Sequence, residues 1–375
     1  MLKGVHLTLM MGQFVPKAVP RSVIDALISV QVTSGSGQHS GFQLVFATSK
    51  TSPITNSLLP GGFFDPSKRV IIAVTINGSP NVLIDGVITQ QAITPSNDPG
   101  QSTLTITGED VSRMMDIIDL SGLIPYPAMP AEARVALILA HYAMYGVVPL
   151  IIPSILIDIP NPVEEIPAHQ GTDLKYINKL ASNVGYVFYI EPGPEIGMNI
   201  AYWGPEIKTG PPQPPLNVNM DAQTNVESLS FSFDGFSKTT YLAFTKEKLS
   251  GLSIPIPVPD ITPLCPPLGQ KLLMPLKVER LKSTSKYGPI RTAVILLAKA
   301  SQKADVISGS GQLDVLRYGQ ILKSRRLVSV RGAGSTYDGL YYVKSVTHNI
   351  KRGEYKQSFT LSRNALIASS SRVSL

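Results

Sequence analysis

The residues that most often carry catalysis or bind metals are few and widely spaced in this chain. The five histidines are His6, His39, His141, His169 and His348. They form neither an HExxH motif nor a pair four residues apart, so no zinc-protease site is predicted. Cys265 is the only cysteine, which excludes an intrachain disulfide and argues against a structural zinc cluster.

Other candidate nucleophiles and phosphate-binding loops have simpler interpretations. Cys265 lies among prolines without a nearby histidine, so it is not predicted to be a nucleophile. The segment Gly309-Ser310-Gly311 follows a predicted helix instead of opening one, and we interpret it as a turn into a strand. Glu164-Glu165 is interpreted as solvated loop charge. We therefore predict a protein that is not an enzyme and needs no cofactor or metal.

Basic residues are concentrated near the end of the chain. Such a cluster could contact nucleic acid, but the aromatic residues around it alternate as strand residues do and show no stacking motif. We predict instead that these charges line a lumen or pair with an acidic neighbouring subunit. The candidates are Lys323, Arg325, Arg326, Arg331, Lys344 and Arg352.

The composition indicates that much of the surface is covered. Charged residues are 16% of the 375, against about 25% in an ordinary soluble domain, and the net charge is +7. Hydrophobic residues are 43% and the mean hydropathy is +0.13, which excludes global disorder. Either other chains bury the low-charge surface, or the protein lies in lipid.

Two segments bear on the membrane question. The first twenty residues lack a cleavage site of small residues, so no signal peptide is predicted. Residues 135–157 carry no formal charge and could span a bilayer, but Gly146, Pro149 and Pro153 interrupt a helix there. We predict a buried helix over 131–145 and a strand over 150–157, with no stable membrane insertion. A membrane anchor in this segment is the alternative.

The order of apolar runs and turns predicts a mainly β fold with α+β inserts. Residues 1–113 read as short strands between turns such as Asn77-Gly78 and Asp85-Gly86, which suggests a first β-barrel. Residues 114–205 read as an α+β unit, with a helix that Thr172 or Asp173 caps. Residues 206–221 are a proline-rich linker. Residues 222–375 form a second barrel with a proline-rich insertion at 254–267 and a helix at 290–306.

An internal repeat supports two barrels. Arg69 opens a strand pair that is followed by Asp85-Gly86 and then by Gln101-Ser102, and a comparable order begins at Arg326. There the matching elements are Asp338-Gly339 and Gln357-Ser358. Chance similarity between β-meanders, which share turn chemistry, is the alternative explanation.

Two segments resemble the phage late-control D family, which includes the hub region of VgrG proteins and the baseplate hub of T-even phages. Residues 171–191 resemble the family's helix–strand motif through Asp173, Tyr176, Ile177, Leu180, Ala181, Gly185 and Tyr186. Residues 309–364 are similar to its closing barrel. The matching positions are Gly309, Gly311, Gly319, Gly332, Gly334, Asp338, Gly339, Tyr341, Tyr342, Val343, Val346, His348, Gly353, Tyr355, Arg363 and Asn364.

The resemblance implies two tandem barrels related to the tail tube, with small α/β domains. Three such chains would form a homotrimeric ring with pseudo-sixfold symmetry, which joins a hexameric inner tube to a trimeric spike. VgrG chains continue into a needle, whereas this sequence ends at Leu375, so a separate spike protein is expected. Baseplate wedge proteins are further expected partners, with assembly in the cytoplasm before incorporation into a phage tail or contractile injection system.

The alternative function is a tail-associated protein that binds or degrades the cell wall. An acid pair or a zinc set would favour that alternative, and neither is visible in the sequence. The lack of such groups favours the structural hub.

Overall fold

The computed structural model describes residues 4–37, 39–98, 101–154, 163, 166–246, 253–256, 265–280, 296–297, 300 and 304–368. For 240–246, 253–256 and 280 it describes the backbone only. Of the described residues, 44% are in strands and 17% in helices, which confirms the predicted mainly β class with α+β additions.

The first half of the main sheet is antiparallel throughout, in the order β3-β4-β7-β6-β5-β1-β2. Alternating apolar residues, as in GFQLVFA of β4, place every second side chain in the core. Two short helices, α1 (Arg21–Ala26) and η1 (Ile54–Leu58), connect its strands. The strands are β1 (Val5–Gly12), β2 (Lys17–Ala18), β3 (Leu27–Gly35), β4 (Gly41–Ala47), β5 (Arg69–Ile76), β6 (Ser79–Thr94) and β7 (Thr103–Asp110).

The second half repeats this order as β12-β16-β19-β18-β17-β11. One difference is that β11 pairs with β17 in parallel, whereas β1 pairs with β5 antiparallel. The elements are β11 (Gln213–Asn217), η4 (Asp221–Gln223), β12 (Val226–Phe233), β16 (Ile307–Asp314), α5 (Val315–Tyr318), β17 (Leu327–Arg331), β18 (Gly339–Lys351) and β19 (Glu354–Arg363). Residues 206–221, which the sequence analysis assigned to a linker, thus contain a strand of the sheet.

Two pairs of matching β-bulges, one bulge of each pair in each half, show which residues of the two halves correspond. The β3–β4 and β12–β16 ladders shift between Leu27/Ser29 and Val226/Ser228, and the β6–β7 and β18–β19 ladders shift between Ile88/Gln90 and Val343/Ser345. Bulges at matching places in matching strands support a true repeat. They align Gly86 with Tyr341, however, so the Asp-Gly pairs matched in the sequence are not equivalent positions.

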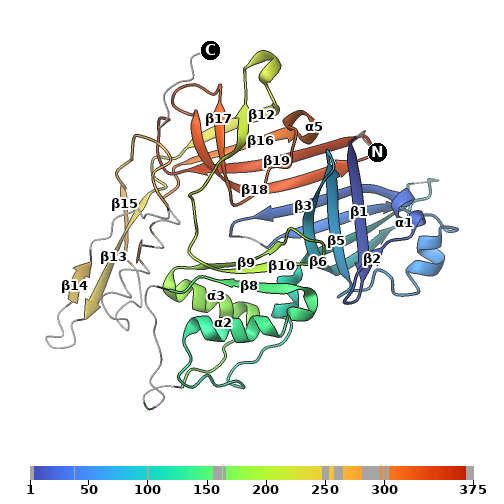
Figure 1. Ribbon diagram of the computed structural model, residues 1–375, viewed down its shortest axis with the longest axis horizontal. Coiled ribbons are helices and arrows are strands. Elements are labelled where there is room, and N and C mark those ends of the chain that lie inside the picture. Colours follow the sequence, from blue (N-terminus) through green and yellow to red (C-terminus); the bar gives the residue numbers. More distant parts are fainter. Residues whose placement is uncertain are drawn as a thin grey trace.

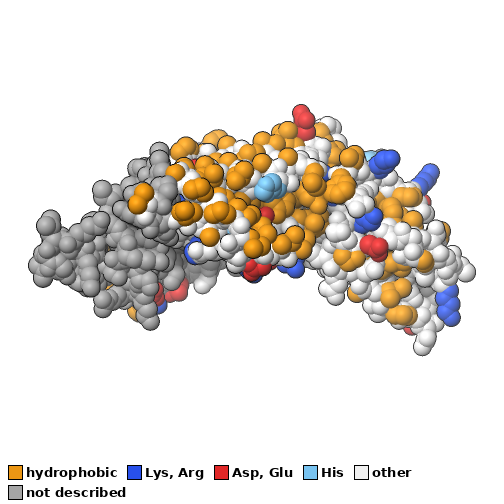
Figure 2. Space-filling view, turned by 90° about the horizontal axis from the view of Figure 1, so that it is seen from below, with side chains coloured by type: hydrophobic (Ala, Val, Ile, Leu, Met, Phe, Trp, Pro, Cys, Tyr) orange, Lys and Arg blue, Asp and Glu red, His pale blue; other side chains and the backbone are white. Residues whose placement is uncertain are grey.

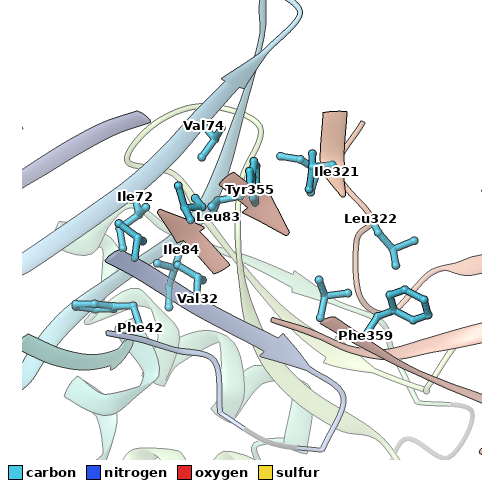
Figure 3. Close-up of a cluster of buried hydrophobic side chains, with 14 of the residues drawn as sticks. Val32, Phe42, Ile72, Val74, Leu83, Ile84, Ile321, Leu322, Tyr355 and Phe359 are labelled. Carbon is cyan, nitrogen blue, oxygen red and sulfur yellow. The ribbon is translucent and has the colours of Figure 1, made fainter. Parts of the chain in front are cut away.

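A single ladder joins the halves. Residues Ser345 to Lys351 of β18 pair with Gly35 to Ser29 of β3, which produces one 13-stranded sheet (Figure 1). Buried side chains of both halves also belong to one hydrophobic cluster, which includes Val32, Phe42 and Ile72 of the first half and Leu322 and Phe359 of the second (Figure 3). The halves are therefore one folding unit at this junction.

The insert folds around a separate core. Its strands form a sheet in the order β8-β10-β9, and α2 and α3 lie along it (Figure 1). The elements are η2 (Val111–Asp116), α2 (Ala131–Ala140), η3 (Ala143–Tyr145), β8 (Val147–Ile151), α3 (Asp173–Val184), β9 (Val187–Pro192) and β10 (Asn199–Gly204). A further small sheet contains β13 (Thr239–Lys246), β14 (Ser253–Ile256) and β15 (Lys277–Arg280). Most of the predicted helix at 290–306 lies outside the described residues, of which 296, 297 and 300 are helical. Much of the insertion at 254–267 and Glu164-Glu165 also lie outside the described residues.

The uncharged segment near residue 140 is only half buried, which differs from the prediction. The helix α2 ends at Ala140, and the strand β8 covers 147–151 instead of 150–157. Val135 and Leu139 are buried, whereas Leu137 and Met144 are exposed. The view in Figure 2, from below Figure 1, shows a face on which apolar side chains gather. In the described ranges, no helix is long and apolar enough to cross a membrane.

Candidate functional site

A buried arginine attaches the insert to the first half of the sheet. Arg69 of β5 is 3% exposed and forms two bonds to Asp85 of β6, with Nε–Oδ1 at 2.8 Å and Nη2–Oδ2 at 2.6 Å. Its Nη2 also donates to the carbonyl oxygens of Tyr145 and Gly197 in the insert. Burial raises the pKa of Asp85, although Arg69 opposes this shift by favouring the carboxylate. Asn199 completes the joint by donating to Asp85 at 2.9 Å.

A second arginine, Arg325, belongs to the second half of the sheet and contacts both the first half and the insert. It precedes β17 in a left-handed conformation with φ of 59° and donates to the carbonyl of Gly35 in β3. Its guanidinium lies 4.1 Å above the ring of Tyr189 and 3.5 Å from Glu191, both in β9. The side chain is only 6% exposed, so it differs from the free lumen or interface charge that the sequence predicted.

A cavity of about 340 Å³ with a mixed polar and apolar lining lies between these two joints, with Ser40, Asp110 and Ser324 in its wall. Asp110 is already engaged, because it accepts from the backbone of Ser40 and Ser112. Among the described residues, no group of three potential metal ligands occurs. The cavity therefore lies where the two halves of the sheet meet the insert, and the described residues around it do not assemble a metal site.

The motif residues Asp338, Gly339 and Arg363 of the second half form and stabilise the turn that leads into β18. Arg363 is fully buried, donates to the carbonyl of Asp338 at 2.8 Å and lies 5.2 Å from the centre of the Tyr341 ring. The carboxylate of Asp338 accepts from the backbone of Ala333. Gly339 follows with φ of 117°, which a side chain rarely adopts. These residues hold the chain that enters β18.

His348 lies at the junction of the halves. Its Nδ1 is 2.7 Å from the hydroxyl of Tyr355 and 3.4 Å from Nε2 of Gln357. Burial lowers the pKa of His348 to about 3 and raises that of Tyr355, so both are neutral at pH 7. Gln357 in turn pairs with both backbone groups of Leu322. This is a satisfied structural network.

The motif around α3 also has a structural role. Thr172 is the N-cap, with its hydroxyl accepting from the backbone of Lys175, which confirms one of the two predicted caps. Gly185 ends the helix with φ of 73°. Asp173 accepts from the Tyr142 hydroxyl at 2.7 Å. Tyr176 stacks on Tyr126, and burial raises the pKa of Tyr126 to about 12. Leu180 and Ala181 are buried in the insert core.

The remaining motif positions lie in turns and cores. Tyr186 packs edge-to-face on Trp203 with ring centres 5.0 Å apart, and Tyr342 is buried beneath Lys208. Gly319 ends α5, and Gly334 is exposed in the turn before β18; both have positive φ.

Two turns predicted from the sequence are strands in the structure. Asp85-Gly86 lies within strand β6, where it pairs with β5. Gly309 and Gly311 lie within strand β16 instead of a turn. A Cβ atom on Gly309 would come within 2.9 Å of the Phe231 ring, and one on Gly311 within 2.7 Å of the Phe359 ring. Glycine here makes room for aromatic rings from neighbouring strands.

The other predicted charges are exposed and do not form one cluster. Lys323 and Arg326 flank the Arg325 joint, Arg331 ends β17, and Lys344 occupies the bulge of β18. Arg352, in the β18–β19 turn, donates to the backbone of Asp25. Of the six predicted charges, only Lys323, Arg325 and Arg326 lie together, and they are close neighbours in the sequence.

The sequence did not predict a mainly polar surface on the sheet, which Val45 interrupts and which Glu109 and Lys356 border. Because side chains alternate between faces, one face carries the core and the other carries mainly hydroxyl and amide groups. We call this second surface the hydroxyl face. It comprises Gln31, Thr33, Gln43, Thr103, Thr105, Thr107, Ser228, Ser230, Ser308, Ser310, Gln312, Ser345, Thr347, Asn349, Ser358 and Thr360, all at least partly exposed. The period-two pattern TLTIT in β7 was an available signal.

The two ends of the repeat leave strand edges without a ladder partner in the described part of the chain. Residues Gln90–Thr94 of β6 pair with β7 on one side only, and β12 is the first strand of the sheet. Each carries an exposed apolar residue on the core side: Ile93 is 50% exposed and Phe233 is 43% exposed. These two edges are the candidate assembly surfaces.

No family model and no curated protein sequence matches this chain. Solved structures do match its fold. A tail protein from Neisseria meningitidis is 13% identical with a TM-score of 0.64, over 96% of this chain and 97% of that one. The 43 kDa tail protein of prophage MuSo2 from Shewanella oneidensis is 13% identical with a TM-score of 0.63, over 96% and 99%.

A third similar chain comes from the lidded Francisella PdpA–VgrG complex. It is 8% identical with a TM-score of 0.58, and the match covers 99% of this protein but 54% of that chain. The fold is therefore that of phage tail proteins and VgrG-type baseplate components, as the sequence resemblance implied.

Proposed function

We propose that this protein is the structural hub of a phage tail or contractile injection baseplate, and that it acts as a homotrimer without catalysis. The observation that carries the proposal is the fold match to two tail proteins over 96% of the chain, together with the internal repeat of the strand order. A trimer of a chain with two similar halves presents six similar units, which suits a threefold spike on one side and a sixfold tube on the other.

The β18–β3 ladder supplies a template for how the ring would close. Inside one chain, β18 of the second half pairs with β3 of the first. The bulges make β6 equivalent to β18, and β12 equivalent to β3. Repeating the same contact between chains would pair β6 of one copy with β12 of the next.

The template also gives a register. Thr347 pairs with Thr33 inside the chain, and the equivalent residues are Ala92 and Ser232. Ala92 of one copy would thus lie opposite Ser232 of its neighbour. On the core side, Ile93 would meet Phe231 and approach Phe233.

Burial supports this contact. His348, the equivalent of Ile93, is buried where β18 meets β3, whereas Ile93 is half exposed at the free edge. Covering Ile93 and Phe233 would remove apolar surface from water, at about 25 cal/mol per Å². The contact would also satisfy the backbone groups of both edges.

The ring would bind an inner tube ring on one side and a spike protein on the other, with baseplate wedge proteins around it. It would assemble in the cytoplasm before joining the particle.

A disulfide test addresses the ring directly. The double variant Ala92→Cys/Ser232→Cys places both thiols at the proposed contact, while the natural Cys265 is buried. Oxidation should give covalent dimers and a closed covalent trimer on non-reducing gels, and native mass spectrometry should show three chains.

The matched control is Ala92→Cys/Ser228→Cys, which moves one thiol four residues along β12 and should not cross-link. Equal cross-linking in both variants would contradict the register. A protein that remains monomeric with tube and spike proteins present would contradict the hub itself.

A further inference from the structure

The cavity of about 340 Å³ between the two arginine joints has a free strand edge in its wall. Residues 79–87 of β6 pair with β5 on one side. On the other side β7 pairs with β6 only from Gly86 onward, because β7 ends at Asp110, opposite Gly86. Among the described residues, 79–85 therefore have no ladder partner on this side. An unpaired edge of this kind can accept an extended chain through its backbone groups.

The cavity begins where β7 ends and follows this edge. Asp110 and residues 80–85 all line it. Its other walls include residues 190–194, which contain the end of β9, and residues 321–326, which precede β17. A segment that entered the cavity would thus lie beside β6 without displacing a strand of the described chain.

Two buried polar atoms in the residues of the wall have no hydrogen-bond partner in the described part of the chain. Asn199 is fully buried, and its Nδ2 donates to Asp85 and to the carbonyl of Tyr145, which leaves its Oδ1 without a donor. The side chain of Arg325 is 6% exposed, and its Nε has no acceptor. A polypeptide backbone supplies both the missing donor and the missing acceptor.

The wall also contains apolar side chains from three segments. Val82 and Ile84 come from β6, Ile190 from β9, and Ile321 from the segment before β17. An extended chain projects alternate side chains to opposite sides, so every second residue of a bound segment could lie against this apolar part of the wall.

The charge that remains free at the cavity is positive. Its three carboxylates, on Asp85, Asp110 and Glu191, already accept from arginines or from backbone groups. Lys323 and Arg326 are exposed and form no ion pair with the described residues. Because unpaired cations attract carboxylates, acidic side chains are favoured in a segment that binds here.

We propose that this cavity binds an extended acidic segment of a partner protein, which pairs as an added strand with residues 79–85 of β6. The segment would continue the line of β7, place its apolar side chains against Val82 and Ile190, and bring its carboxylates to Lys323 and Arg326. The ring contact proposed above uses residues 90–94 on the opposite edge of β6, so this site does not depend on the ring.

A labelled octapeptide of alternating glutamate and valine tests the charge, with binding measured by fluorescence anisotropy on the full chain. It should bind saturably, and an octapeptide of alternating lysine and valine should not. Lys323→Glu/Arg326→Glu should weaken binding by about tenfold or more, because attraction is replaced by repulsion. The matched control Lys344→Glu/Arg352→Glu makes the same change of charge outside the cavity and should bind as the natural protein does.

Methylation of the octapeptide tests the strand pairing. In an extended strand, successive N–H groups point to opposite sides, so N-methyl groups on alternate residues block pairing with β6 in one frame and leave it intact in the other. We expect the two methylated octapeptides to differ, with one of them binding about tenfold or more weakly.

Single cysteines locate the bound octapeptide. Asn81→Cys puts a thiol on β6 at the cavity wall, and Ser57→Cys puts one on the exposed η1, which does not line the cavity. The natural Cys265 is buried. The glutamate–valine octapeptide should slow the reaction of a maleimide at position 81 and leave the reaction at position 57 unchanged.

The other outcomes each overturn the proposal. Absence of saturable binding, or equal losses in the two charge-reversal variants, would exclude an acidic segment at this cavity. Equal binding of the two methylated octapeptides would exclude strand pairing, and an unchanged reaction at position 81 would place the octapeptide elsewhere. Free glutarate that competes as strongly as the octapeptide would make the cavity a site for small anions instead.

Discussion

The buried pair of Arg69 and Asp85 shows how one residue can hold two units together. The guanidinium satisfies a carboxylate within the sheet and carbonyl groups of the insert at the same time. Desolvating such charges is costly, so the pair depends on every bond being made. Its role is to fix the position of the insert.

We expect Arg69→Met to destabilise the protein by about 3–5 kcal/mol, because Asp85 is left buried without its counterion. Urea unfolding at pH 7 measures the loss. The double variant Arg69→Met/Asp85→Leu should recover much of it. Equal loss in both variants would mean that packing, not the stranded carboxylate, is responsible.

His348 predicts a pH dependence of stability. Its folded pKa of about 3 lies below the ordinary value of 6.5, so the unfolded chain binds the proton more tightly. The contribution of neutral His348 to the free energy of unfolding is complete above pH 6.5. It is lost as the pH falls toward 3, at up to about 1.4 kcal/mol per pH unit. Urea unfolding between pH 7 and pH 4.5 should show this slope, and His348→Gln should reduce it. If His348→Gln leaves the slope unchanged, the pH dependence of stability comes from carboxylates and not from His348.

Among the elements, β16 depends on its glycines more than on its exposed residues. A Cβ atom on Gly311 would lie 2.5 Å from the carbonyl oxygen of Ser228 and 2.7 Å from the Phe359 ring. We expect Gly311→Ala to cost about 1–3 kcal/mol, measured by chemical unfolding. Ser310→Ala, on the neighbouring exposed position, should cost less than about 1 kcal/mol. Similar losses in both would contradict the steric explanation.

The end of β6 matters only for the whole assembly. Ile93 is half exposed in the single chain, so Ile93→Glu should leave the melting temperature nearly unchanged. In the ring it would bury a charge against Phe231 of the next copy, and native mass spectrometry should show monomers. Ile196→Glu, an equally exposed apolar position in the insert, is the control that should still form trimers. A trimer of Ile93→Glu would rule out this edge as the contact.

Elements whose stabilising residues are close in the sequence could be predicted, whereas residues whose contacts are distant in the sequence could not. The helix α3 could be predicted because Thr172 and Gly185 supply its cap and its end within one segment. Gly309 and Gly311 could not be placed, because their neighbours are aromatic rings from strands far away in sequence. Arg325 looked like one more basic surface residue, and only its distant partners in β3 and β9 make it a joint.

The sequence by itself determined the mainly β class and indicated the insert, because strand alternation, caps and turn residues are local properties. It suggested a repeat, but the strand order and the bulges were needed to establish it and to correct its alignment. Only the tertiary structure decided how the repeat is used. Pairing of β18 with β3 joins residues about three hundred positions apart, and no local signal specifies such a partner. That ladder makes the halves one sheet, gathers scattered serines and threonines into one face, and leaves two edges for a neighbour.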